Sequence, residues 1–501
     1  MASFLLAALA WCIPIIVMVT YALEVIGVRR WRDLPPGPRP LPIIGNFHAV
    51  AWRSANRSLA HLADGYGPLM TIWLGRRIPT IVVSGPDAAR EVLRNADLAG
   101  RPPMDHWRAE GHSANSIINL PPHDKWRAMR RFAATELFSR ARLDDARQQR
   151  LRQEKVHREM TRLVSESAAR GEAVDVGHAA FVTVLGLLSS TLYSVDLGRR
   201  QDVREMVKAA SLLAATPTIS DAVPALAAAD LQGARRKFGA LIRRAHGIID
   251  EQFVRRRRGR DAGELRKGDM TDVVLDKERE WKQEGSPMNY DAVKGMFTEF
   301  FVAGTETTSS AVEWAMAELL RHPEWMNKVK EELRTVIGTK AVMEEADISK
   351  LPHLQAVVKE TLRLHPVVSL GYYQAMATTQ VQGYTIPKGS TILVNYWAIH
   401  RKGDVWIHPD KFMPERFFDK DISFWGKDFE LIPFSAGRRM CVGLPLAHRM
   451  VHLMLGSLLC NFNWTLPQEV EENGVDMTEK FGAVVSMATP LKAIAANKCG
   501  E

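Results

Sequence analysis

The chain has 501 residues, 46% hydrophobic and 25% charged, which is typical of a globular protein with a large core. Its net charge of +9 is scattered, with no basic patch interleaved with aromatic residues. This pattern argues against a nucleic-acid partner and favours anionic lipid or an acidic protein. The cysteines do not indicate a disulfide framework; they are Cys12, Cys441, Cys460 and Cys499.

The N-terminal segment Phe4 to Leu23 has no charged residue and is long enough to cross a bilayer as a helix. Basic residues follow it and none precedes it, so the positive-inside rule places the C-terminal bulk in the cytosol. A cleaved signal peptide is the alternative, but the sequence offers no convincing basic start or cleavage site. We expect an uncleaved membrane anchor over residues 1–30, a stiff proline-rich linker over 31–45 and one large domain over 46–501.

The start of the large domain is expected to contain short strands and then mostly helices. Leu69 to Leu74 and Thr80 to Ser84 have strand patterns, and Pro86 to Leu93 has a helical one. Two later stretches are expected to be irregular: a long loop over Arg101 to Pro122 and a charged surface segment over Asp261 to Gly285. A loop of that length inside a compact domain is often functional.

Two further segments have recognisable patterns. Residues 203 to 250 combine apolar, small and proline residues, which predicts two helices joined by an apolar turn. Gln380 to Asn395 alternates as a β-hairpin does, with its turn expected at Pro387-Lys-Gly.

The longest helix is predicted over Asp291 to Leu320, where apolar residues recur at helical spacing. Its middle contains glycine and several hydroxyl residues, although glycine costs roughly 1 kcal/mol relative to alanine there and hydroxyls loosen the backbone ladder. Ala303 and Gly304 leave room beside the helix, and Thr307 lies one turn further on the face of Ala303. Glu306 adds an ionisable group in an apolar setting. These features indicate a functional segment, with a small-residue helix crossing as the alternative.

A single cysteine lies in the stretch Phe434-Ser-Ala-Gly437-Arg-Arg439-Met-Cys441-Val-Gly443, directly before a predicted helix over Leu444 to Phe462. A cysteine ahead of a helix start lies at the positive end of the backbone dipole, which favours its thiolate. The glycines permit a tight turn and the close approach of a flat group, and the arginines suit carboxylate partners. Together these properties indicate a haem-binding site. A buried structural cysteine at a turn is the alternative, and a cysteine hydrolase would need a positioned histidine.

These residues resemble the cytochrome P450 superfamily, whose pattern Phe-x-x-Gly-x-Arg-x-Cys-x-Gly is matched at every defined position. The middle of the long helix resembles the oxygen-binding helix of the same family. The resemblance implies a mainly α fold with small β-sheets, the cytochrome P450 fold, preceded by an N-terminal transmembrane helix. It also implies haem b as the cofactor and Cys441 as the axial ligand of its iron. The other cofactor-binding residues that it implies are Phe434, Gly437, Arg439, Gly443, Ala303 and Gly304.

The resemblance assigns roles to residues elsewhere in the chain. Thr307 and Glu306 are the implied catalytic residues, which guide protons to the oxygen that is reduced. Trp126 and Arg130, four apart on one helix face, are expected to contact a haem propionate. A structural network is expected from three further residues, Glu360, Arg363 and Arg416. Gln374 departs from the family pattern, because many relatives have an arginine or histidine there for a propionate.

The substrate pocket is expected to be apolar with few polar anchors. Family position implies that its lining includes Phe297, Phe301, Ala303, Val367 and Val484. The two phenylalanines could equally pack the helix, and no single residue names the substrate.

The sequences of several segments are most similar to those of plant microsomal P450s of the geraniol hydroxylase and terpenoid oxidase group. The implied protein is a haem-thiolate monooxygenase of the endoplasmic reticulum membrane, with one span and a cytosolic catalytic domain. It would take electrons from NADPH through NADPH-cytochrome P450 reductase, contact membrane lipid, and oxidise a small apolar plant metabolite, with hydroxylation of a terpenoid favoured. Alkaloid or phenolic oxidation and ring coupling remain open. A haem isomerase or dehydratase without a reductase is a further alternative, and the intact Glu306-Thr307 pair argues against it.

Overall fold

The computed structural model describes residues 33–497, except 42–43, 76–78, 215, 217, 223, 339 and 341. The predicted anchor over residues 1–30 lies outside the described residues. The described part of the linker packs along the first strand rather than standing free, because the Thr71 N–H donates to the Pro36 carbonyl at 2.8 Å. A Cβ on Gly37 would lie 1.9 Å from the Thr71 carbonyl oxygen, so this close approach requires glycine.

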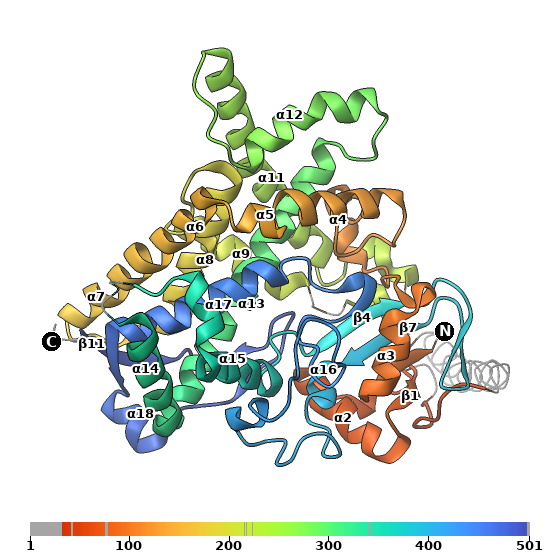
Figure 1. The fold of residues 1–501 in the computed structure, drawn as a ribbon. Coiled ribbons are helices and arrows are strands. Elements are labelled where there is room, and N and C mark those ends of the chain that lie inside the picture. The colour runs from red at the N-terminus through yellow and green to blue at the C-terminus, as the bar shows by residue number, and fades with distance from the viewer. Residues whose placement is uncertain are drawn as a thin grey trace, which may run out of the picture.

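Helices form most of the described chain, as predicted, and Figure 1 shows most of them above and to the left of a smaller sheet region, with α2, α3 and α16 beside the sheet. They are α2 (Ala55–Tyr66), α3 (Pro86–Arg94), α4 (Asp124–Glu136), α5 (Arg140–Leu143), α6 (Ala146–Gln153), α7 (Thr161–Ala169), α8 (Val176–Tyr193), α9 (Gln201–Ala214), α10 (Ile219–Ala222), α11 (Ala234–Asp261), α12 (Met270–Gln283), α13 (Tyr290–Arg321), α14 (Pro323–Ile337), α15 (Pro352–Leu364), α16 (Tyr396–Ile399), α17 (Leu444–Asn461) and α18 (Gln468–Asn473). The stretch expected to be a long loop contains a kinked 3-10 segment, η4 (Asp105–Asn115).

The strands are short and belong to four small sheets. They are β1 (Leu69–Ile72), β2 (Thr80–Val83), β3 (Val174–Asp175), β4 (Leu370–Gln374), β5 (Thr379–Val381), β6 (Tyr384–Ile386), β7 (Thr391–Asn395), β8 (Phe462–Thr465), β9 (Glu479–Lys480), β10 (Ser486–Met487) and β11 (Lys492–Asn497). The largest sheet has the order β1-β2-β7-β4, with β2 and β7 parallel and the other neighbours antiparallel. A second sheet has the order β3-β11-β8, and β9–β10 and β5–β6 form two-stranded sheets.

Two predictions from the sequence are wrong in detail. The charged segment expected over Asp261 to Gly285 contains helix α12, because Met270, Val274 and Trp281 lie at helical spacing and are buried against the body. The hairpin is formed by β5 and β6, and its turn lies at Gln382 and Gly383, which both have positive φ. Residues after Pro387 instead enter β7 of the largest sheet.

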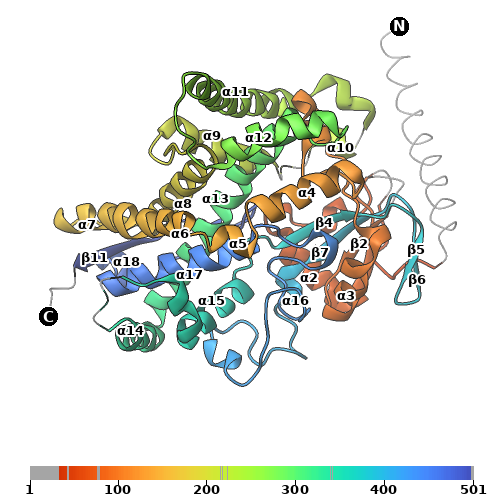
Figure 2. The ribbon, with the colours of Figure 1, turned by 45° about the horizontal axis from the view of Figure 1, so that its top comes forward.

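Helix α13 is the axis around which the other helices pack. It starts at the Asn289 cap, whose side chain accepts from the Ala292 N–H at 2.8 Å, and ends before His322-Pro323. It packs against α8, α9, α15 and α17, and Figure 2 shows it passing beneath α9, α11 and α12. Most of its residues are buried, so the exceptions in its middle stand out.

Among the described residues, α8 is the one helix long and apolar enough to cross a membrane. It lies inside the protein, with 83% of its residues buried, and it packs along α13. This is the position of a core helix, whose apolar character on all sides reflects burial on all sides.

Glu313 on α13 is a buried carboxyl that makes stability depend on pH. Its oxygen accepts from the Leu491 N–H at 3.0 Å, and desolvation raises its pKa from 4.5 to about 7 against that bond. Because the folded protein binds more protons than the unfolded chain between these values, stability is lost as pH rises through this window. The loss is up to about 3 kcal/mol of unfolding free energy.

Glu313→Gln is therefore expected to flatten the decline in thermal stability of the holoprotein between about pH 5 and about pH 8. Glu331→Gln on the exposed face of α14 is the control and should keep the wild-type slope. An unchanged slope in Glu313→Gln would show that another group titrates.

Candidate functional site

The turn before Cys441 is set by a glycine with a defined role. Gly437 has a φ of +66°, and a Cβ there would lie 2.0 Å from the Leu93 carbonyl oxygen of α3. Glycine is therefore required at this position by the turn and by packing on α3. Gly443 has ordinary space around it, since a Cβ would lie 3.8 Å from the Phe138 ring.

Cys441 lies on the wall of an enclosed but accessible region. Its N–H donates to the Phe434 carbonyl at 2.9 Å, and its side chain is exposed. Desolvation nevertheless raises the pKa of Cys441, against the Gly443 and Leu444 N–H groups and the charge of Arg130, which lower it. The N–H groups at the helix start lower the pKa of Cys441, as expected. Desolvation raises this pKa by more than they lower it.

Two other residues border accessible space inside the protein. Ala303 is exposed although it lies in the middle of the buried helix α13. Tyr372 of β4 is 37% exposed, yet desolvation raises its pKa to about 12. α13 packs against α17, which begins three residues after Cys441.

The remaining residues of the α13 motif divide between this region and the neighbouring helices. The Thr307 hydroxyl donates to the Ala303 carbonyl at 2.6 Å. Gly304 differs from the expectation, because a Cβ there would lie 3.0 Å from a Leu188 methyl of α8, and glycine therefore serves the crossing with α8. Desolvation raises the pKa of Glu306, opposed by a hydrogen bond from the Ser211 hydroxyl of α9.

Trp126 lies between two arginines beside the Cys441 turn. The guanidinium groups of Arg130 and Arg439 lie 5.5 Å and 4.6 Å from its ring centroid. The Trp126 indole N–H donates to the Ile117 carbonyl at 3.0 Å. Trp126 therefore packs its ring against both arginines, and the expectation that it contacts a haem propionate stays a prediction.

The arginine cluster has a third member that sequence reasoning did not identify as a propionate partner. Arg101 donates to the carbonyls of Ile118 and Tyr372, and its guanidinium lies 4.9 Å from the Tyr373 ring centroid. Gln374 points elsewhere, since its amide donates to the Gly389 carbonyl at 3.3 Å. Many relatives have a positive charge at the position of Gln374, and here Arg101 places one nearby. The local sequence of Arg101, Arg-Pro-Pro at the start of a loop, did not indicate this role.

The cluster of Arg101, Arg130 and Arg439 has the electrostatics of an anion site. Within the described chain, no carboxylate lies at ion-pair distance from any of the three. Desolvation lowers the pKa of Arg439 to about 9 and also lowers that of Arg130, with the neighbouring Arg101 charge adding to both effects. Three neighbouring positive charges bonded to neutral carbonyls are what a ligand bearing carboxylates would neutralise.

A buried acid on α13 organises the loop that carries these carbonyls. Glu299 accepts from the Ser116 hydroxyl, from the Ile117 N–H at 2.9 Å and from the Ile118 N–H at 3.2 Å. The Ile118 carbonyl then accepts from Arg101 at 3.0 Å. The loop therefore connects α13 to the arginine cluster, a link that no local pattern around Glu299 indicated.

The structure brings together the three residues of the expected structural network. Glu360 pairs with Arg363 at 2.7 Å and with Arg416 at 3.1 Å. It also accepts from the Met413 N–H at 2.8 Å, while Arg363 donates to the carbonyls of His400, Pro409 and Lys411. The network joins α15 to the long segment that leads to Cys441.

The expected substrate residues fall into two groups. Phe297 and Phe301 are buried on α13 and pack on Tyr193 of α8, with ring centroids 5.9 Å and 5.8 Å away, so they are packing residues here. Val367 and the half-buried Val484 lie in two segments joined by a bond of 2.8 Å from the Val485 N–H to the Val367 carbonyl. The second pair and Ala303 remain the candidates for substrate contact.

These residues fit the haem that the resemblance implies. The group carries an iron that accepts a thiolate and an edge with two carboxylates, and Cys441 and the arginine cluster supply partners for both.

Comparison with known proteins gives the same answer. The cytochrome P450 family model matches residues 35–494. The chain is 41% identical to geraniol 8-hydroxylase of Swertia mussotii, with 93% of this chain and 94% of the relative covered. It is 42% identical to cytochrome P450 76C2 of Arabidopsis thaliana, covering 94% of each, and 40% identical to carnosic acid synthase of Rosmarinus officinalis, covering 92% of each.

A solved structure has the same fold. A zebra fish cytochrome P450, in a structure with progesterone, aligns with a TM-score of 0.75 and 24% identity, covering 88% of this chain and 99% of that one. With the matched family model and the plant relatives, the chain belongs to the cytochrome P450 family, whose members hold haem b and use electrons derived from NADPH.

Proposed function

We propose that this monooxygenase hydroxylates a small apolar terpenoid. The substrate, O2, NADPH and a proton give the hydroxylated product, water and NADP+, with the two electrons delivered by a flavin reductase. We place the enzyme on the endoplasmic reticulum membrane with its catalytic domain in the cytosol. The uncharged run Phe4 to Leu23, which lies outside the described residues, supports that location.

The observation that carries the proposal is the similarity to geraniol 8-hydroxylases over nearly the whole of both chains. The candidate substrate residues support it, because they are small or apolar, namely Ala303, Val367 and Val484. Such a lining favours a compact apolar substrate and offers few polar anchors.

The reconstituted holoenzyme, with a plant reductase and NADPH, tests the proposal. We expect NADPH-dependent hydroxylation of geraniol, and weaker or no turnover of the aromatic probe 7-ethoxycoumarin. Oxidation of 7-ethoxycoumarin alone would move the substrate class to phenolics. Conversion of a fatty acid hydroperoxide without NADPH would instead establish the isomerase or dehydratase alternative.

The bound haem supplies the oxygen-activating chemistry, and the protein supplies orientation and protons. Cys441 would bind the iron of this group through its sulfur, and the arginine cluster would bind its carboxylates. Thr307 presents its hydroxyl next to Ala303, and Glu306 holds a proton more readily than an exposed carboxyl because burial raises its pKa. Glu306 and Thr307 are the residues that would hold the protons this chemistry consumes.

Thr307→Ala is expected to uncouple NADPH consumption from hydroxylation. Product formed per NADPH should fall on the order of tenfold or more, because a positioned proton-transfer group contributes at least that much. Thr298→Ala is the matched control, since its hydroxyl makes the same bond to the carbonyl four residues before it, Lys294, at 2.8 Å. Equal coupling in the two variants would remove Thr307 from the proton route.

A further inference from the structure

One buried face of α13 carries polar side chains where a core helix normally carries apolar ones. Ser310, Trp314 and Glu318 are each four residues apart and therefore lie in one line, and all three are buried. Burying polar groups is unfavourable unless each is hydrogen-bonded. We call these three residues the polar stripe, and their partners show what the stripe does.

The N-terminal part of the polar stripe, Ser310 and Trp314, binds a single peptide group. The Ser310 hydroxyl and the Trp314 indole N–H both donate to the Val485 carbonyl, at 3.1 Å and 3.2 Å. The N–H of the same residue, Val485, donates to the Val367 carbonyl at 2.8 Å. One residue therefore ties α13 to both segments that carry the candidate substrate valines.

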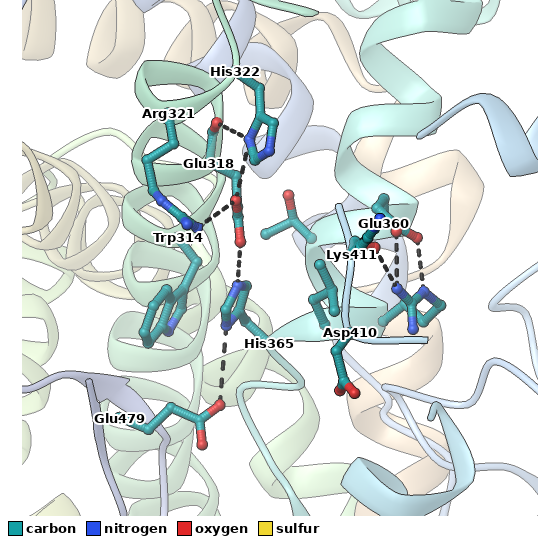
Figure 3. A network of polar contacts seen from close by, with 12 residues as sticks. Trp314, Glu318, Arg321, His322, Glu360, His365, Asp410, Lys411 and Glu479 are labelled. Carbon is teal, nitrogen blue, oxygen red and sulfur yellow. Dashed lines mark hydrogen bonds and ion pairs between the residues drawn. The ribbon is translucent and has the colours of Figure 1, made fainter. Parts of the chain in front are cut away.

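The C-terminal part of the stripe contacts His365, which Figure 3 shows beside Trp314 and Glu318. The His365 ring stacks on Trp314, with parallel planes and centroids 4.2 Å apart, and its Nε2 lies 2.7 Å from Glu318. Its Nδ1 lies 4.0 Å from Glu479, the first residue of β9, which pairs with β10. Glu479 is in turn held by Arg57 at 2.9 Å.

We propose that the polar stripe determines substrate selectivity by fixing the distance between α13 and the segments that carry Val367 and Val484. Hydrogen bonds are directional, whereas apolar contacts can slide, so polar bonds hold a pocket wall in one position. His365 lies two residues before Val367, and Val485 follows Val484 directly. The stripe residues are positioning residues, because they act through the two valines. The proposal rests on the proposed function, in which the two valines contact the substrate.

Trp314→Phe is the primary variant, because phenylalanine keeps a ring against His365 and removes the N–H that holds Val485. In the holoprotein, hydrogen exchange of residues 482–488 should become faster. The ratio of dissociation constants for N-butylimidazole and N-octylimidazole, read from the haem spectrum, should change at least about threefold, since pocket fit to added methylenes is what the wall controls. Trp281→Phe on α12 is the matched control and should change neither quantity.

Ser310→Ala is the milder second variant if Trp314→Phe folds poorly. The double variant removes both donors from the Val485 carbonyl and leaves a buried acceptor unsatisfied, so its effect on exchange should exceed the sum of the single effects. An unchanged ratio of the two dissociation constants, even with faster exchange, would overturn the proposal and leave the stripe a structural role. Because the imidazoles report pocket shape whatever the natural substrate is, a failure to hydroxylate geraniol would not affect this test.

Discussion

Replacing Cys441 with serine is expected to abolish the thiolate-type Soret band of the reduced carbon monoxide complex, together with hydroxylation. A serine hydroxyl does not ionise near neutral pH and gives the iron far less electron density than a thiolate. The turn itself should survive, because its bond from the N–H of residue 441 to the Phe434 carbonyl does not involve the side chain. The measurement is the difference spectrum of the purified holoprotein, with product formation as the second readout.

Cys460→Ser provides the control for this experiment. Cys460 lies on α17, the helix that follows the Cys441 turn, and is half-buried. Its replacement should leave the spectrum and the activity unchanged. Persistence of the thiolate-type band in Cys441→Ser would mean that another side chain holds the iron, and the assignment of Cys441 would fail.

The parts of the site that the sequence predicts are those whose signal is local. The Cys441 turn precedes a helix by three residues, and the unusual middle of α13 lies within six consecutive residues, so both can be read without knowing the fold. The long helix was predicted to within one residue at each end, because its cap and the following proline are local signals as well.

The site residues that could not be predicted from the sequence act through contacts between distant parts of the chain. Arg101 joins the cluster only because the fold brings it to Tyr372 and Ile118, and Glu299 matters only because a loop about 180 residues earlier binds to it. Phe297 and Phe301 match the family position for substrate contact, yet their rings turn toward α8. Helical spacing gives the face of a residue but not the identity of its neighbour across the interface.

The pattern Glu-x-x-Arg illustrates this limit within one chain. Three of its occurrences form an ion pair, Glu318-x-x-Arg321, Glu331-x-x-Arg334 and Glu360-x-x-Arg363. Spacing cannot separate them, but burial does: Glu331 and Arg334 are 61% and 78% exposed, whereas both members of the third pair are 0% exposed. Exposed pairs contribute little, and breaking a buried pair leaves a charge without its partner.

Glu360→Gln is accordingly expected to lower the unfolding free energy of the holoprotein by about 3–5 kcal/mol, the range for removing one partner of a buried ion pair. The carboxylate is shared by Arg363, Arg416 and the Met413 N–H, so the neutral amide leaves two buried guanidinium groups without an anion. Since this network ties α15 to the segment leading to Cys441, haem should also be lost more readily on dilution. Denaturant unfolding and haem retention measure the two effects.

Glu331→Gln makes the same chemical change in the same spacing on the exposed face of α14 and should change stability by less than about 1 kcal/mol. The difference between the two variants isolates burial as the cause, because charge, side-chain size and sequence pattern are matched. If Glu360→Gln were as stable as Glu331→Gln and kept its haem equally well, the network would be incidental to the fold. The position of Cys441 would then depend on packing of α13, α17 and the glycine turn alone.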